Sequence, residues 1–179
     1  MLDTYTHQIH TPFGQVTVSS DGHALTGLWF DGQKYYGKTL GDHTIENQGL
    51  PLFTQVEAWL NDYFSGKQPT LDFEVKPAGT EFRKTVWNEL LSIPYGNLIT
   101  YGEIAQRFYE TQGKNMSAQA VGGAVGHNPI SIIIPCHRVV GSNGSLTGYA
   151  GGIGVKKKLL QLEDIDLTHL HEPTKGTAL

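Results

Sequence analysis

The residues best able to do covalent chemistry lie in one short stretch, SIIIPCHRVVG, which runs from Ser131 to Gly141. It contains Cys136, the only cysteine of the 179-residue chain, followed directly by His137. A histidine can lower the pKa of a thiol or accept its proton, and the resulting thiolate is a nucleophile. A lone cysteine is more often a small buried hydrophobic residue. Neighbouring side chains on a strand also point to opposite faces. The dipeptide alone therefore leaves both interpretations open.

The isoleucine run before the cysteine predicts a buried strand that is interrupted at Pro135, because proline has no N–H to donate to a sheet. Further on, VVGSNGSLTGYAGG combines an Asn-Gly turn with Tyr149 and a glycine pair, which is typical of a loop that folds over a pocket. The segment IGVKKKLLQLED then predicts a helix, with Val155, Leu159 and Leu162 at helical spacing.

Glu163, at the end of that predicted helix, is a candidate third member of a triad that would orient His137. The alternative is a solvated surface acid, and the residues by themselves favour that alternative. The acidic segment that follows, DIDLTHLHEPTKGTAL, suggests no role and could be a disordered tail.

Three helices are predicted upstream of the cysteine. Phe82, Val86 and Leu90 recur at helical spacing until Pro94, which ends the first. The second begins at a capping box formed by Thr100 and Glu103, and the third begins at Ser117 and ends at Asn128-Pro129. The polar turn ETQGKN separates the last two. Two short helices joined in this way are compatible with a helix-turn-helix.

The third of these helices has two unlike faces. A rotation of about 100° per residue groups one set that should face the core, namely Ala118, Val121, Ala124 and Val125. It places another set on the opposite side, namely Gln119, Gly122, Gly123 and Gly126. A glycine inside a helix costs about 1 kcal/mol relative to alanine, so the three glycines need a reason. Close packing of another element is one explanation, and close approach of a DNA backbone is the other.

The N-terminal half predicts strands followed by a helix. Alternating apolar residues flank the Asp21-Gly22 turn, which is a hairpin signal, and Pro51 suits the first turn of a helix. The expected fold class is α/β with two domains. The first, residues 1–78, would hold an antiparallel sheet with a helix. The second, residues 79–179, would be mostly helical, with a helix-turn-helix and a short active-site strand.

Charge is distributed unevenly along the chain. The net charge of −4 divides into −5 for residues 1–78, +4 for 79–162 and −3 for the remainder. A basic second half would suit a polyanionic partner. One cysteine excludes an internal disulfide and a thiolate-rich zinc site. No apolar run approaches the ~20 residues that span a bilayer, and the start of the chain does not resemble a signal peptide. A cytoplasmic protein without a membrane partner is expected.

Taken together, these motifs resemble one family. PCHRVV, preceded by AVGGAVGHNPISIII and followed by TGYAGG and a helix ending in Glu163, is similar to the O6-alkylguanine-DNA alkyltransferases. The resemblance is close from Glu81 to Glu163 and looser over the predicted N-terminal hairpin, whose domain is ribonuclease H-like in that family. Such proteins repair DNA by moving an alkyl group from guanine to their own cysteine in a single turnover.

The resemblance implies a role for five residues. Cys136 would accept the alkyl group, and His137 would deprotonate it through a bound water. Glu163 would hold the imidazole by a hydrogen bond, and Asn128 would tie the turn before the cysteine to the recognition helix. Tyr101 would lie over the flipped base and donate a hydrogen bond towards N3 of guanine.

The implied partner is double-stranded DNA, bound in its minor groove by a monomer after the damaged base has been flipped out. The carbonyls of Cys136 and Val139 would read the exocyclic amine, and the loop at Tyr149 would close over the pocket. The residues expected to contact DNA or base are Ala118, Gln119, Gly122, Gly123, Ser131, Val139, Tyr149, Ala150 and Gly151.

No cofactor and no metal are expected. Some relatives hold zinc in the N-terminal domain partly through cysteines, whereas this half offers only His7, His10, His23 and His43. The chain departs from the family at Gln119, where an arginine usually fills the space left by the flipped base. Ser131 stands where some relatives have proline and Ala150 where some have serine, and the turn ETQGKN is longer than in some relatives.

Two other functions remain to be weighed. A non-enzymatic lesion-binding protein would share the fold but lack the acceptor cysteine, which is present here. A redox sensor or thiol hydrolase on another fold would explain Cys136 and His137. It would not explain Tyr101, Asn128 or the glycine-faced helix.

Overall fold

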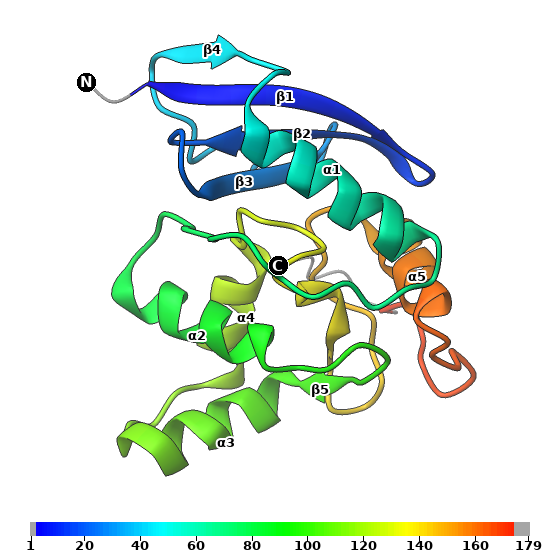
Figure 1. Ribbon diagram of the computed structural model, residues 1–179. Helices are drawn as coiled ribbons and strands as arrows, with labels where there is room; N and C mark the ends of the chain where they lie inside the picture. Colours follow the sequence, from blue (N-terminus) through cyan, green and yellow to red (C-terminus); the bar gives the residue numbers. More distant parts are fainter. Residues whose placement is uncertain (1–2, 174–179) are drawn as a thin grey trace. The chain divides into compact units, whose positions relative to one another are not determined.

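The computed structural model describes residues 3–173, and its internal contacts divide the chain into two compact units (Figure 1). The first contains the chain up to Ala78 together with Pro129–Ser131, and the second contains the rest. None of the helices between residues 3 and 173 is long and apolar enough to cross a membrane.

The first unit is a four-stranded sheet with the strand order β3-β2-β1-β4. Its strands are β1 (Thr4–Thr11), β2 (Gly14–Ser20), β3 (Leu25–Phe30) and β4 (Thr44–Glu46). Strands β1, β2 and β3 are antiparallel neighbours, whereas β4 runs parallel to β1. The predicted hairpin around Asp21-Gly22 is confirmed as β2 and β3. The sequence pattern did not predict strand β1, because its sequence TYTHQIHT contains few apolar residues.

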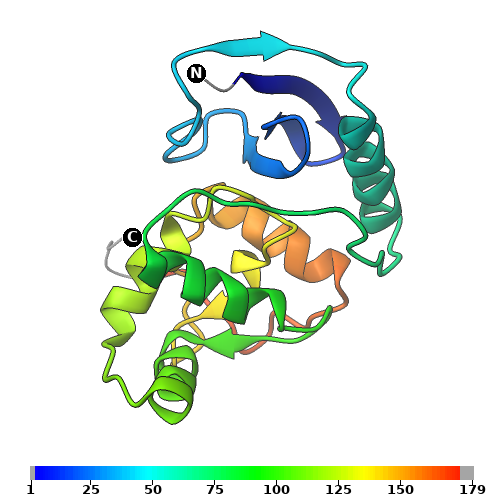
Figure 2. The same cartoon turned by 60° about the vertical axis from the view of Figure 1, so that its left-hand side comes forward.

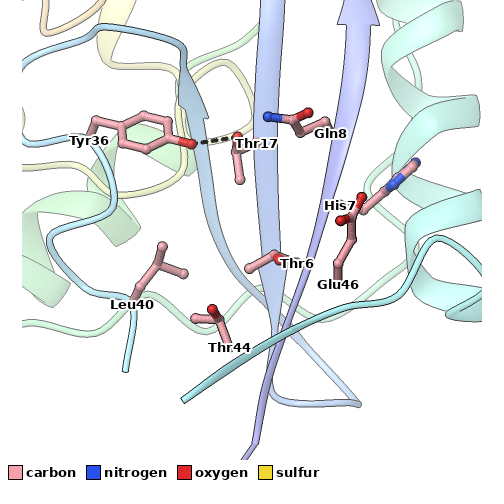
Figure 3. Close-up of a pocket in the computed structure, with 8 residues that line it drawn as sticks. All are labelled: Thr6, His7, Gln8, Thr17, Tyr36, Leu40, Thr44 and Glu46. Carbon is pink, nitrogen blue, oxygen red and sulfur yellow. Dashed lines mark hydrogen bonds between the residues drawn. The ribbon is translucent and has the colours of Figure 1, made fainter. Parts of the chain in front are cut away.

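Helix α1 (Pro51–Phe64) packs against this sheet, as the view in Figure 2 also shows. Pro51 occupies its first turn, as predicted. Its buried residues include Phe53, Val56, Leu60 and Tyr63, and the ring of Phe53 stacks on that of His7 in β1 with centroids 5.9 Å apart. The unit also contains a polar pocket (Figure 3). Thr6, His7, Gln8, Thr17, Tyr36, Leu40, Thr44 and Glu46 line it.

Residues Pro129–Ser131 join the first unit through the edge of its sheet. The amide of Leu28 donates to the carbonyl of Pro129 over 2.8 Å, and the amide of Ser131 donates to the carbonyl of Leu28 over 2.9 Å. Ile130 is fully buried in this contact. Residues Pro129–Ser131 are therefore held by the sheet of the first unit.

The second unit is mostly helical. It contains α2 (Glu81–Leu91), α3 (Tyr101–Gln112), α4 (Ala118–Gly126) and α5 (Ile153–Leu162), a 3₁₀ turn (Cys136–Arg138), and the short parallel strands β5 (Ile99–Thr100) and β6 (Val139–Val140). Helices α2 and α3 both pack on α4. The predicted caps are confirmed: Thr100 and Glu103 form a capping box, and Ser117 caps α4.

The turn between α3 and α4 is shorter than predicted. Glu110, Thr111 and Gln112 belong to α3, so the connection consists of residues 113–117. Gly113 ends the helix in the left-handed conformation, with φ of 65°. The glutamate and glutamine side chains of the predicted turn favour helix, and Gln106 donates to Glu110 one turn later over 3.1 Å.

Candidate active site

Cys136 lies in a 3₁₀ turn, so the buried strand predicted from Ser131 to Gly141 is confirmed only at Val139–Val140, although residues 131–140 are buried as predicted. Its amide donates to the carbonyl of Ile134 over 2.8 Å, and the amide of Arg138 donates to the carbonyl of Pro135 over 3.0 Å. The reason is local: Pro135 has no N–H, and Ile132 has the left-handed φ of 71°, so an extended ladder cannot form. Successive side chains of a 3₁₀ turn are about 120° apart, rather than on opposite faces.

Asn128 holds this turn from the end of α4. Its side-chain nitrogen donates to the carbonyl of Ile134 over 2.8 Å and to the sulfur of Cys136 over 3.2 Å. Both residues are buried, with Cys136 only 5% exposed. Burial raises the pKa of the Cys136 thiol, although the hydrogen bond from Asn128 and the charge of Lys156 oppose that effect. The resting cysteine is therefore a protonated thiol.

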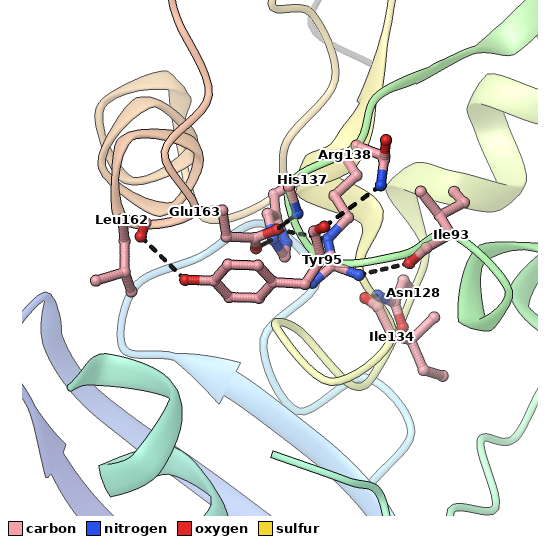
Figure 4. Close-up of polar contacts among 10 residues, drawn as sticks. Ile93, Tyr95, Asn128, Ile134, His137, Arg138, Leu162 and Glu163 are labelled. Carbon is pink, nitrogen blue, oxygen red and sulfur yellow. Dashed lines mark hydrogen bonds and ion pairs between the residues drawn. The ribbon is translucent and has the colours of Figure 1, made fainter. Parts of the chain in front are cut away.

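His137 and Glu163 form a buried pair (Figure 4). The Nε2 atom of His137 lies 2.5 Å from Oε2 of Glu163, and neither residue is more than 1% exposed. Burial lowers the pKa of His137 and outweighs the opposite effect of the carboxylate, so the ring is neutral. When Nε2–H donates to the carboxylate, Nδ1 of the neutral ring carries the lone pair that can accept a proton.

Glu163 is held as an anion by further donors. Arg138 donates through Nε to its Oε1 over 2.7 Å, and the amide of Gly96 donates to the same oxygen over 3.0 Å. Burial acts to raise the pKa of Glu163, but the hydrogen bonds from His137 and Arg138 and the charge of Arg138 lower it to about 2. Arg138 is itself fixed, because its Nη1 donates to the carbonyl of Ile93 over 2.6 Å.

Sequence reasoning missed Arg138 as a member of this network, and it also missed Lys156. The predicted buried stripe of α5 was Val155, Leu159 and Leu162, whereas the buried residues are Lys156, Leu159 and Leu160. Lys156 is fully buried although it begins a run of three lysines. The run of lysines does not indicate that the first of them is buried, because its burial depends on hydrogen-bond acceptors elsewhere in the chain.

Those acceptors are two carbonyls beside the cysteine. Lys156 donates to the carbonyl of Val139 over 2.6 Å and to that of Thr147 over 2.9 Å. Burial lowers the pKa of Lys156 to about 8, and the neighbouring Cys136 acts in the opposite direction. A protonated amine therefore joins β6 to the loop that contains Tyr149.

The two tyrosines singled out by the sequence lie around the same loop. Tyr101 is the first residue of α3, and its hydroxyl donates to the carbonyl of Thr147 over 2.9 Å. Burial raises the pKa of Tyr101 to about 12, so the hydroxyl is a neutral hydrogen-bond donor. The ring of Tyr149 packs edge-on against that of His137, with centroids 6.4 Å apart. Ala150 and Gly151 follow in a half-buried turn before α5.

The faces of α4 differ from those predicted. Ala118, expected in the core, is exposed together with Gln119, whereas Gly122 and Gly126 are buried. The buried arc is wide because both α2 and α3 pack on this nine-residue helix. Gly123 is half-buried, and a side chain added there would meet nothing within 4 Å. The open surface of α4 is therefore its first turn and Gly123.

Ser131 lies in the first unit, and its hydroxyl donates to Oε1 of Gln33 over 3.2 Å. It is a neighbour of the sheet and not part of the hydrogen-bonded group around Cys136. Within residues 3–173, no three histidine, cysteine, aspartate or glutamate side chains gather closely enough to hold a metal ion. The chemistry available at Cys136 is thus that of a thiol with an imidazole, a carboxylate and a buried ammonium nearby.

Comparisons with known proteins point in one direction. Residues 81–165 match the DNA-binding domain of 6-O-methylguanine DNA methyltransferase, and residues 4–77 match the ribonuclease-like domain of the same proteins. A methylated-DNA–protein-cysteine methyltransferase of Methanosarcina mazei is 43% identical over 163 residues, which cover 91% of this chain and 99% of that protein. One of Mycobacterium bovis is 44% identical over 155 residues, which cover 87% of this chain and 89% of the relative.

A solved structure agrees with these matches. Mycobacterium tuberculosis OGT in complex with DNA superposes with a TM-score of 0.77 at 41% identity, and the match covers 94% of each chain.

Proposed function

Because the chain belongs to the 6-O-methylguanine DNA methyltransferase family, we propose that Cys136 is the residue that accepts the alkyl group. The protein repairs O6-alkylguanine in DNA by transferring the alkyl group irreversibly to its own cysteine. The acceptor is assigned to Cys136 because the chain contains no other cysteine. A thioether is a stable product, so each molecule reacts once.

The network around Cys136 supports a mechanism in which the thiol loses its proton only when a substrate is present. His137 takes the proton through a water, with Nδ1 as the acceptor and Glu163 stabilising the imidazolium through Nε2. The thiolate attacks the alkyl carbon, a sulfur–carbon bond forms, and the carbon–O6 bond breaks with its electron pair going to guanine. The departing guanine anion then takes up a proton, and the imidazolium of His137 returns the proton of the thiol to water, so protons and charges balance.

Neighbouring groups would prepare the base for departure. Tyr101 is a neutral donor next to the thiol, and we assign to it the hydrogen bond towards N3 of the leaving guanine. To make that bond it must release the carbonyl of Thr147, which Lys156 continues to hold. The carbonyls of Cys136 and Val139 would accept from the exocyclic amine. Tyr149, Ala150 and Gly151 would close over the flipped base.

The DNA contacts are proposed for the open part of α4. Ala118 and Gly123 present little bulk there and Gln119 projects beside them, which suits the minor groove. Gly122 is buried and contributes packing rather than a contact surface. Flipping is required because the reacting carbon is inaccessible inside a duplex. We further propose that Gln119 fills the space left by the base less completely than an arginine would.

The remaining assignments follow from the same account. Residues 1–78 would form the ribonuclease H-like domain and residues 79–179 the DNA-binding and alkyl-acceptor domain. The protein would act as a monomer on double-stranded DNA. A cytoplasmic location suits a protein whose only thiol must stay reduced. The reaction as written uses no cofactor and no metal.

The test is to mix the protein with a duplex oligonucleotide containing one O6-methylguanine and to measure the intact protein mass. The proposal predicts a gain of one methyl group, with one lesion removed per protein molecule. A lesion-binding protein without activity would instead bind the oligonucleotide tightly and keep its original mass. An undamaged duplex of the same sequence is the control.

A further inference from the structure

The segment Asp164–Glu172, here called the C-terminal strap, is docked on the second unit and is not a free tail. In Figure 1 it is the orange-to-red segment that follows α5. Asp164 turns the chain back with the left-handed φ of 59°, and the amide of Ile165 donates to the carbonyl of Leu160 over 3.0 Å. The strap therefore begins directly after Glu163, the residue that holds His137. Residues 174–179, the end of the acidic segment, lie outside the described residues.

The strap is bound to the loop Gly141–Leu146 through backbone atoms. The amide of Leu146 donates to the carbonyl of His171 over 2.8 Å, and the amide of His171 donates to the carbonyl of Gly144 over 3.0 Å. Ser145 and His171 form a parallel bridge. At Gly144 the two segments are so close that an added side chain would lie 2.4 Å from the carbonyl oxygen of His169.

Apolar side chains support the same contact. Val140, Leu146 and Leu160 form a small buried cluster, and Leu146 is fully buried. From the strap, Ile165, Leu167 and Leu170 pack against this cluster. The strap thus supplies one wall of the cluster in which Leu146 is anchored. Lys157 and Glu172 also form an ion pair at the surface, which adds little by itself.

The loop held in this way leads directly into the site. Thr147 follows Leu146, and its carbonyl accepts hydrogen bonds from both Tyr101 and Lys156. Tyr149, which packs against His137, comes two residues later. We infer that the strap is a positioning element for alkyl transfer: it fixes Gly144–Leu146 and thereby sets the shape of the loop that closes over the flipped base. This inference rests on the proposed function, in which Thr147–Gly151 line the base pocket.

The matched pair His171→Pro and His171→Ala tests the backbone contact. Proline removes the N–H that donates to Gly144, whereas alanine keeps both backbone hydrogen bonds and removes the ring, whose Nε2 lies 3.2 Å from the carbonyl oxygen of Asn143. The substrate is the duplex with one O6-methylguanine, used at saturating concentration in single-turnover experiments. We expect the rate constant of transfer to fall about 10-fold in His171→Pro, because a displacement of reacting groups by about 1 Å can cost up to a hundred-fold. His171→Ala should stay within about 2-fold of the wild type.

Two readouts separate positioning from loss of folded protein. Because each molecule reacts once, the amount of methyl transferred at completion gives the active fraction, and the rate constant gives the quality of the site. The inference predicts a slower rate with a full end point, unchanged affinity for undamaged duplex, and faster hydrogen exchange at the amide of Leu146. A reduced end point with an unchanged rate constant would mean that the strap only stabilises the fold and would overturn the inference.

If His171→Pro does not fold, the inference is tested with Leu170→Ala. Leu170→Met is the conservative variant at the same position. Leu170→Ala weakens the apolar contact and should slow transfer at a full end point, whereas Leu170→Met should restore the wild-type rate. Equal rate constants for all three proteins would contradict the inference. Failure of the wild type to take up a methyl group would instead contradict the proposed function, so the two failures are distinguishable.

Discussion

Around Cys136, charged groups are buried and bonded to one another, whereas the first turn of α4 presents Ala118 and Gln119 to solvent. Glu163 receives three donors there, and Lys156 satisfies two carbonyls. Buried charges of this kind are tolerated only when they are paired and hydrogen-bonded. The reaction centre is therefore preorganised before substrate arrives. The described residues at the start of α4 have no comparable network, and this exposed turn is where the DNA contact is proposed.

This contrast indicates how the two regions should respond to change. A substitution in the buried network removes a partner from several other groups at once, so its effects on rate and on folding should both be large. A substitution on the exposed turn of α4 should change DNA affinity alone.

The largest effect is expected for Glu163→Gln. Glutamine keeps the shape but cannot stabilise an imidazolium, so the rate constant of alkyl transfer should fall about 100-fold while affinity for undamaged DNA is kept. Single-turnover transfer and DNA titration measure the two quantities. Glu57→Gln, an exposed acid on α1, is the matched control and should react like the wild type. Loss of DNA affinity together with rate in Glu163→Gln would mean that the two regions are not separable.

A second difference should appear in the dependence of folding stability on pH. The pKa of Glu163 is lowered from 4.5 to about 2 in the folded protein. The carboxylate therefore contributes about 3 kcal/mol to the free energy of unfolding above pH 4.5, and that contribution is lost as the pH falls from 4.5 towards 2.

Urea unfolding of the wild type and Glu163→Gln at several pH values measures this contribution. The difference in the free energy of unfolding between the two proteins should become smaller as the pH falls from 4.5 towards 2. Gln119→Arg changes the exposed turn of α4. Its free energy of unfolding should differ from that of the wild type by the same amount at every pH. If the difference in the free energy of unfolding between Glu163→Gln and the wild type does not change with pH, the buried network does not hold the carboxylate as an anion.

The smallest effect is expected for Gln119→Arg. A cation at this position should raise the affinity for duplex DNA roughly 5-fold at moderate salt. The slope of log affinity against log salt concentration should also steepen, by the amount expected for about one added phosphate contact. The transfer rate constant at saturating DNA should stay close to that of the wild type. Gln161→Arg, an exposed position on α5, makes the same charge change away from α4. Equal affinities for both arginine variants would mean that position 119 does not contact DNA.

The same contrast separates what the sequence could predict from what it could not. Caps obey local rules, so Thr100, Glu103 and Ser117 were placed correctly from the chain alone. The 3₁₀ turn at Cys136 depends on Pro135 and on the left-handed backbone of Ile132, which the sequence does not reveal, so the isoleucine run was mistaken for a strand.

The buried cations were harder to predict because their partners are far away in sequence. Arg138 depends on Ile93 and Glu163, and Lys156 depends on Val139 and Thr147. No periodicity marks a lysine that is buried by such acceptors. Glu163 was identified from the family resemblance, since the residues alone favoured a solvated surface acid. The docking of the strap was likewise not predicted, because it combines backbone hydrogen bonds to a loop with apolar contacts that follow no helical or strand period.

The central claim is that Cys136 receives the alkyl group, and it can be tested at the level of a single residue. After reaction with a duplex that contains O6-methylguanine, the protein is digested and its peptides are fragmented in a mass spectrometer. The account predicts one methyl group on Cys136, restored guanine in the DNA, and neither product with Cys136→Ala. A methyl group on another residue such as His137, or transfer that persists in Cys136→Ala, would contradict it.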